Sequence, residues 1–337
     1  MKPFGIYTLA NDVVYDQLVA LLNSIEVNVS QDIPICVIPY NDQLDQVKQE
    51  IKSRKNVTLF NNGESLQRWD DLANKVWAVH PAAKQKNISR NALYRSPLLR
   101  KLSAFDGEFE KFVFYDGDSL AMKPLEQVLE KLDNYDFIFD DWEHKKTRQN
   151  AALDVDIIEA TGLYKEEHIR PKLHCSSFFA SKQGIFSPSE IEPMQQRLIE
   201  GDEIGWLPKW WDDAILFNYM TLICDRPLFN FTLSPNGQDR TGNCANADPF
   251  VNINNILYNQ EGLKPIYRLH YMGYSASDFA RLSQGEDVNI RYREEFLHYR
   301  FLKQPEQKPQ TLKSPSLISK TNRLLNKTMK KIKFSIS

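Results

Sequence analysis

The stretch KFVFYDGDSLAMKP, from Lys111 to Pro124, joins an apolar run to two closely spaced aspartates. Residues 112–115 are aromatic or β-branched and Gly117 interrupts the run, a pattern typical of an interior strand rather than of a helix. Asp116 and Asp118 follow this strand directly. Because ligands bind beyond the carboxyl ends of strands in an open α/β sheet, the stretch predicts a ligand site.

The aspartate pair itself indicates a bound cation. Two carboxylates this close repel each other unless positive charge lies between them. Mg²⁺ and Mn²⁺ prefer oxygen ligands and are usually shared with substrate phosphates. The alternative is a solvated Asp-Gly-Asp turn with no ligand, since these residues are common in tight turns.

The segments around this strand alternate between strand and helix patterns. Strands are predicted for FGIYTLAND (4–12), IPICVIPY (33–40), NVTLFN (56–61), YDFIFDDW (135–142) and CSSFFASK (175–182). Helical spacing of apolar residues is found in 14–28 and 42–53, a short helix is expected from Ser96, and another from Asp212. This alternation predicts βαβ units and a parallel sheet, and therefore the α/β class.

Charge is distributed unevenly along the chain of 337 residues. The net charge is only −2, which gives no electrostatic argument for a nucleic-acid partner. Prolines and lysines gather after residue 304, so we expect one domain over 1–303 and a basic, partly disordered or amphipathic extension over 304–337. Residues 320–334 have the pattern of a basic amphipathic helix on an anionic membrane surface, and a disordered solubilising tail is the alternative.

The cysteines and the N-terminal residues indicate a compartment. Cys36, Cys175, Cys224 and Cys244 show no paired metal spacing, which favours a reducing environment. The first residues lack the apolar core of a signal peptide. We therefore expect a cytoplasmic protein. The basic extension would associate it with the inner face of the membrane.

Three motifs in one order carry a family resemblance. YTLANDVVYDQLVALLNSI (7–25), DGD (116–118) and HYMG (270–273) resemble the glycogenin and galactinol-synthase type of retaining glycosyltransferase, over about Phe4 to Tyr274. The resemblance implies the GT-A fold, a single Rossmann-like domain whose mostly parallel mixed sheet is flanked by helices. It also implies transfer of a sugar from a UDP-linked donor, with Mn²⁺ or Mg²⁺ as cofactor, to an acceptor that the motifs do not identify.

The resemblance assigns roles to individual residues. The metal ligands would be Asp116, Asp118 and His270, and the catalytic pair would be Asp212 and Asp213. The donor would be bound by Thr8, Leu9, Ala10, Asn11, Asp12, Tyr15, Lys101, Gly117, Ser176, Ser177 and Gly273.

Two departures from the family pattern affect the chemistry. Ala276 stands where relatives carry a lysine that neutralises the leaving diphosphate, and Arg281 or Arg291 are the candidate replacements. Asp213 stands where relatives carry a glutamine, so a carboxylate is available to attack the anomeric carbon. The first departure favours the alternative of a non-catalytic relative that binds a nucleotide or glycan at a membrane surface.

Overall fold

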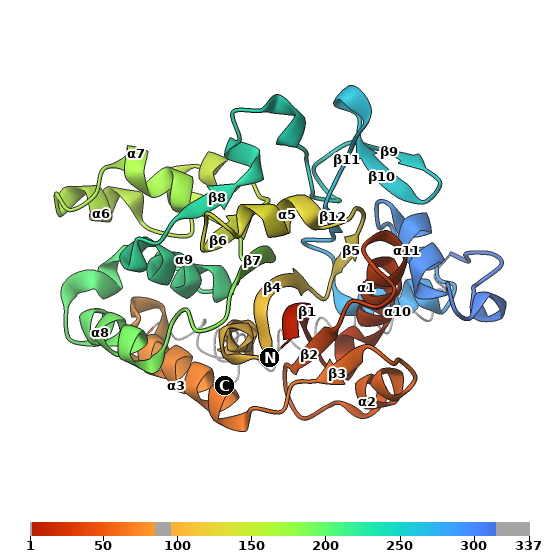
Figure 1. The fold of residues 1–337 in the computed structure, drawn as a ribbon, viewed down its shortest axis with the longest axis horizontal. Helices are drawn as coiled ribbons and strands as arrows, with labels where there is room; N and C mark the ends of the chain where they lie inside the picture. Colours follow the sequence, from red (N-terminus) through yellow and green to blue (C-terminus); the bar gives the residue numbers. More distant parts are fainter. Residues whose placement is uncertain (1, 85–95, 315–337) are drawn as a thin grey trace.

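A computed structural model describes residues 2–84 and 96–314. Within these residues the central sheet has seven strands in the order β3-β2-β1-β4-β7-β6-β8 (Figure 1). The strands are β1 (Lys2–Ala10), β2 (Ile35–Pro39), β3 (Val57–Leu59), β4 (Phe109–Asp116), β6 (Phe137–Phe139), β7 (Phe178–Lys182) and β8 (Leu228–Asn230). Only β7 runs antiparallel to its neighbours, β4 and β6. The predicted α/β class with a mostly parallel mixed sheet is confirmed.

Alternating side chains of β1 and β4 build a core on each face of the sheet. Tyr7 and Phe114 pack on one face with residues of α3 (Gly63–Val79), α8 (Pro188–Ile199) and α9 (Asp213–Cys224). Ile6 and Val113 pack on the other face with residues of α1 (Tyr15–Asn28), α2 (Asp45–Lys52) and α5 (Glu126–Lys131). Buried on both faces, these strands show the continuous apolar runs that are typical of a parallel sheet.

The helices begin close to the predicted positions, with one difference in type. The segment Ser96–Asp106 is a 3-10 helix, η3, rather than an α-helix. It buries Lys101 together with Leu102 and Phe105. Two short helices, α6 (Val155–Ala160) and α7 (Glu166–Ile169), lie in the polar connection before β7.

The last third of the chain forms a smaller layer beside the sheet. It contains β9 (Phe250–Ile253), β10 (Ile256–Asn259), β11 (Lys264–Pro265), β12 (Arg268–His270), α10 (Ala276–Ser283) and α11 (Arg293–Arg300). β12 pairs antiparallel with β5 (Ser119–Ala121), and His270 is in register with Ser119. This pairing carries His270 to the residues that follow β4.

The chain beyond residue 304 begins by packing against the domain. Lys313 N donates to Gly285 O at 2.8 Å, and Asp287 N donates to Lys313 O at 2.8 Å. Residues 320–334, for which the membrane contact is predicted, lie outside the described residues.

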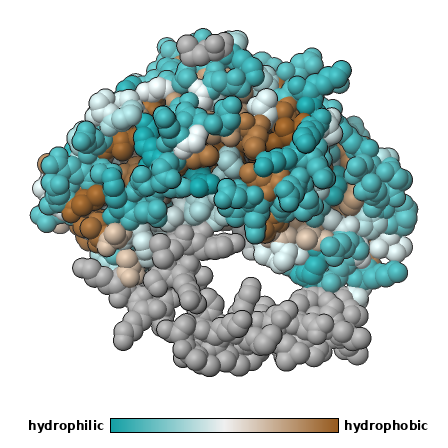
Figure 2. Space-filling model, turned by 90° about the horizontal axis from the view of Figure 1, so that it is seen from below, coloured by the Kyte–Doolittle hydropathy of each residue, from teal (hydrophilic) through white to brown (hydrophobic). Residues whose placement is uncertain are grey.

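The described part of the chain has a mixed surface (Figure 2) and no helix that could span a membrane. Hydrophilic residues dominate the face in Figure 2, and hydrophobic residues show between them. Within the described ranges, every helix is too short or too polar to cross a bilayer.

Candidate functional site

The turn after β4 brings the aspartate pair to the carboxyl end of the sheet. Asp116 ends β4 in register with Leu9 of β1. A Cβ on Gly117 would lie 3.1 Å from Leu9 O, so only a glycine lets the turn pass this close to β1 without a shift. Asp118 follows, and its carbonyl accepts a hydrogen bond from Tyr271 N at 3.0 Å. The backbone therefore fixes Asp118 beside the end of β12.

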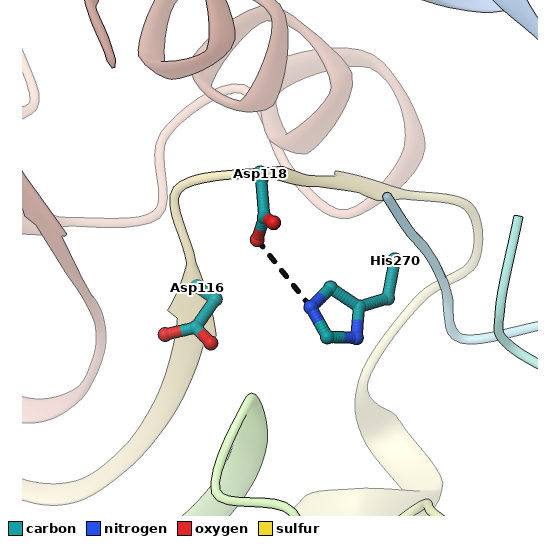
Figure 3. A group of neighbouring side chains, drawn as sticks. All are labelled: Asp116, Asp118 and His270. Carbon is teal, nitrogen blue, oxygen red and sulfur yellow. Dashed lines mark ion pairs between the residues drawn. The ribbon is translucent and has the colours of Figure 1, made fainter. Parts of the chain in front are cut away.

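Asp116, Asp118 and His270 form a group that fits a divalent cation. One ligand atom from each lies within 4.8 Å of the others, a little more than the roughly 4.2 Å that separates opposite ligands of one magnesium ion. Asp118 and His270 point toward each other, with Asp118 Oδ1 3.5 Å from His270 Nε2, and the Asp116 carboxylate lies beside them (Figure 3). Burial favours the neutral acid, but His270 and Lys101 together outweigh burial and hold the pKa of Asp118 below its usual value.

Lys101 lies behind this group as a buried counter-ion. Its side chain is 1% exposed, and Nζ lies 2.7 Å from Asp116 Oδ1 and 2.7 Å from Asp213 Oδ2. Nζ also donates to Ser176 O at 3.4 Å. These acceptors use the three N–H donors of the ammonium group. Lys101 therefore joins Asp116 to Asp213 and does not line the cavity described below.

The two aspartates at the start of α9 have different environments. Asp212 caps the helix by accepting from Ala214 N at 2.9 Å, and burial together with the nearby Asp213 raises its pKa to about 6. Asp213 Oδ2 accepts from Ser176 Oγ at 2.6 Å as well as from Lys101. Burial opposes ionisation of Asp213, but Lys101 and the hydrogen bond from Ser176 together outweigh burial and lower the pKa. Asp213 therefore stays ionised to a lower pH than Asp212 does.

The serines before β7 bind protein groups. Ser176 has a φ of 59°, in the left-handed region that favours glycine, and this conformation directs Ser176 Oγ to Asp213. Ser177 O accepts from Asp116 N at 2.9 Å, and Ser177 Oγ accepts from the buried Arg268 at 2.7 Å. Both serines thus hold the walls of the site in position.

Asp116, Asp118 and His270 are called the metal group below. A cavity of about 590 Å³ opens beside it. Of the residues assigned from the sequence, its lining includes Leu9, Ala10, Asn11, Asp116, Gly117, Asp118 and Asp213. Sequence reasoning did not identify Val13, Val14, Gln17, Tyr40, Leu98 and Tyr274 as lining residues. Their only sequence signal is position, since most of them follow the carboxyl ends of β1 and β2 or begin the adjoining helices.

The remaining residues assigned to the donor lie outside this lining. Thr8 is fully buried within β1. Asp12 caps α2 by accepting from the backbone N–H of residues 45, 46 and 47, and Tyr15 donates to Glu50 at 3.1 Å. Gly273 has a φ of 89° in the turn between β12 and α10. These residues shape the surroundings of the cavity.

The arginines proposed to replace the missing lysine are engaged elsewhere. Ala276 lines the cavity. Arg281 forms ion pairs with Asp278 and Glu286, while Arg291 donates to Asp248 O at 2.9 Å. Among the described residues the cavity lining therefore contains three carboxylates and no lysine or arginine side chain.

Two of the tryptophans near α9 belong to the core. Trp206 is 2% exposed and Trp211 is 5% exposed. Trp211 packs edge-on against Trp77 and His80. Core packing therefore accounts for both side chains.

Comparison with known proteins extends the fold assignment. No family model and no curated protein sequence matches the chain. Among solved structures, the galactosyltransferase LgtC in complex with donor and acceptor sugar analogs superposes with a TM-score of 0.50 at 12% identity, covering 88% of this chain and 95% of LgtC. Mouse xyloside xylosyltransferase 1 in its apo form gives a TM-score of 0.47 at 9% identity, covering 67% of this chain and 84% of that one. On the strength of the sheet, its flanking helices and the LgtC superposition, the chain has the GT-A fold.

Proposed function

We propose that this chain is a metal-dependent glycosyltransferase that moves a sugar from a UDP-linked donor to a glycan, lipid or protein acceptor with retention of configuration. The observation that carries the proposal is the group Asp116, Asp118 and His270 at the carboxyl end of β4, beside a cavity that also contains Asp213. Because one fold can host several activities, the proposed activity is based on the residues of this site rather than on the fold.

The lining divides the cavity into regions of different chemistry. Asn11, Gln17 and Tyr40 offer polar groups near the ends of β1 and β2, where a base and ribose would lie. Asp116, Asp118 and His270 would hold a manganese or magnesium ion, which supplies positive charge to the diphosphate as it leaves. Lys101 bridges Asp116 to Asp213, and the donor sugar would lie beside Asp213 and the preceding Asp212.

Asp213 supports two routes with the same stereochemical outcome. In the first, its ionised carboxylate stabilises positive charge at the anomeric carbon while the acceptor enters on the face that UDP leaves. In the second, a carboxylate oxygen bonds to the anomeric carbon as the carbon–oxygen bond to UDP breaks. The acceptor oxygen then displaces the carboxylate, and its proton passes to a base. A glycosylated Asp213 peptide in the mass spectrum would support the second route, and full activity of Asp213→Asn would exclude it.

The first test is binding of nucleotides. We expect UDP with Mn²⁺ to raise the melting temperature more than GDP or ADP with Mn²⁺, and UDP alone to have little effect. Asp118→Ala should abolish the shift. UDP release from UDP-sugars, measured with and without acceptor extracts, then tests transfer. Absence of a shift with every nucleotide would contradict the donor site.

A non-catalytic binding protein is the second candidate, because no cationic side chain among the described residues lines the cavity beside the leaving group. Such a protein would bind UDP with Mn²⁺ and release no UDP from any UDP-sugar. The extension would add a peripheral contact with anionic membrane lipids in either case. Sedimentation with anionic and with neutral vesicles, for the full chain and for a chain ending at residue 314, tests that contact.

A further inference from the structure

Among the described residues no cationic side chain lines the cavity, which raises the question of what binds the diphosphate besides a metal ion. Three carboxylates line the cavity, and a metal ion alone would leave part of the diphosphate charge facing them. Helix α10 begins at this cavity, since Ala276 is both its first residue and part of the lining.

The first turn of α10 presents unused hydrogen-bond donors. The N-cap Ser275 binds the third helical residue, with Asp278 N donating to Ser275 Oγ at 3.2 Å. The N–H groups of the first two residues, Ala276 and Ser277, have no partner within a helix, and no hydrogen bond to another described residue is found for either. They add to the positive end of the helix dipole, which favours an anion.

The negative charge of the acidic residue in this turn, Asp278, is balanced by hydrogen bonds and an ion pair. The Asp278 carboxylate accepts from Ser275 N at 3.1 Å and from Ser275 Oγ at 2.7 Å, and it pairs with Arg281. Burial disfavours its charge, yet the Ser275 hydrogen bonds and Arg281 hold the pKa of Asp278 below its ordinary value. The carboxylate is therefore committed to the cap.

A second lining residue independently indicates a ligand with hydrogen-bond donors. Gln17 is 5% exposed, lines the same cavity, and its Oε1 has no hydrogen-bond partner among the described residues. A buried amide oxygen without a donor is unfavourable unless a ligand supplies one. A ligand that carries N–H or O–H groups and an anion would satisfy both Gln17 and the first turn of α10, and a nucleoside diphosphate has this combination.

We infer that the N terminus of α10 binds the diphosphate of the donor through the backbone N–H groups of Ala276 and Ser277, in place of a cationic side chain. The inference rests on the proposed donor site and adds the group that receives the leaving charge. It explains how an alanine occupies a lining position at the start of this helix without leaving the anion unbound.

The test removes one N–H and keeps the helix. Proline is favoured at the first helical position, and Ser275, with φ −86° and ψ 151°, has the extended conformation that a following proline requires. Ala276→Pro therefore deletes the Ala276 N–H, while Ala276→Val adds similar bulk and keeps it. Gly63→Pro, at the first residue of α3 and away from the cavity, controls for a new proline at a helix start.

The measurement is the affinity for UDP and for uridine by calorimetry in the presence of Mn²⁺. We expect Ala276→Pro to bind UDP about tenfold more weakly than Ala276→Val, as for loss of one hydrogen bond to a charged group. Uridine affinity should be the same in these two variants, and Gly63→Pro should bind UDP like the wild type. Ala276→Lys should bind UDP more tightly than the wild type.

The outcomes separate the two proposals. Equal UDP affinity for Ala276→Pro and Ala276→Val would overturn the inference and leave the donor site intact. No UDP binding by the wild type would overturn the donor site itself, and the inference with it. A loss of uridine affinity in Ala276→Pro that equals the loss of UDP affinity would show a distorted cavity and would also overturn the inference.

Discussion

Replacing Lys101 with methionine tests how the carboxylates of the site are held together. The Lys101 ammonium contacts Asp116 and Asp213 at 2.7 Å each, and its side chain is 1% exposed. Methionine keeps an apolar stem of similar length but leaves the two carboxylates without their counter-ion. Removal of one partner from a buried ion pair costs about 3–5 kcal/mol. Because Asp116 is 24% and Asp213 16% exposed, water screens part of this cost, and we expect a loss near 3 kcal/mol.

The loss of folding stability in Lys101→Met should be larger at neutral pH than at acidic pH. Lys101 holds the pKa of Asp213 below its ordinary 3.8 in the folded state, against the effect of burial. The stabilisation that Asp213 contributes is therefore complete above about pH 5 and is lost as pH falls through its folded pKa. Burial raises the pKa of Asp116 above its ordinary value despite Lys101, so the contact of Lys101 with Asp116 is lost at a higher pH. The gap between wild type and Lys101→Met should be full at pH 7 and should narrow as the carboxylates become protonated.

The assay is urea denaturation followed by tryptophan fluorescence, at pH 7 with EDTA and again with Mn²⁺. Mn²⁺ should restore part of the stability of Lys101→Met, since it supplies positive charge to Asp116. Lys111→Met is the matched control, because Lys111 pairs with Asp133 at the surface, where the side chains are 36% and 67% exposed. We expect it to lose less than about 1 kcal/mol. A loss in Lys101→Met no greater than in this control would show that the Lys101 ammonium does not stabilise the two carboxylates.

Three further outcomes follow from the described contacts. Gly107→Ala places a Cβ 1.8 Å from the hydroxyl of the fully buried Tyr7, and overpacking should cost about 1–3 kcal/mol in urea denaturation; a neutral result would contradict it. Burial raises the pKa of Asp140 to about 7, so folding stability should fall by on the order of 4 kcal/mol as the pH rises from about 4 to about 7, and an equal slope in Asp140→Asn would argue against this assignment. Asp118→Asn should remove the rise in melting temperature with Mn²⁺, and a rise that persists would exclude Asp118 as a ligand.

Local sequence patterns predicted six of the seven strands of the central sheet and the aspartate pair, and β8 was not predicted. The predicted strands of the first half are apolar runs between turn residues. Their observed bounds lie within the predicted stretches, except that β1 begins two residues earlier and β4 begins three residues before and ends one residue after the run 112–115. The pair Asp116 and Asp118 was found because polar residues directly after an apolar strand stand out. His270 required the family resemblance, since the β5–β12 pairing that brings it to Asp118 joins distant segments.

Local sequence patterns could not predict the contacts between segments that are distant in the sequence. Lys101 has the sequence context of a helix-face lysine, and only the packing of η3 against β4 and α9 encloses it between two carboxylates. Leu98 and Tyr40 line the cavity because separate segments meet there. The positive φ of Ser176 accompanies a hydrogen bond to Asp213, a distant residue in the sequence, and no motif encodes this contact.

The pairing of β5 with β12 also bears on how the protein is made. Asp118 precedes β5 and His270 ends β12, and the segment between them contains β6, β7 and α9. During synthesis the first four strands of the sheet emerge long before His270 does. A nascent chain would therefore hold two carboxylates of the metal group and lack the imidazole until the other strands of the sheet have left the ribosome. Metal-dependent nucleotide capture would then begin only when the sheet is complete.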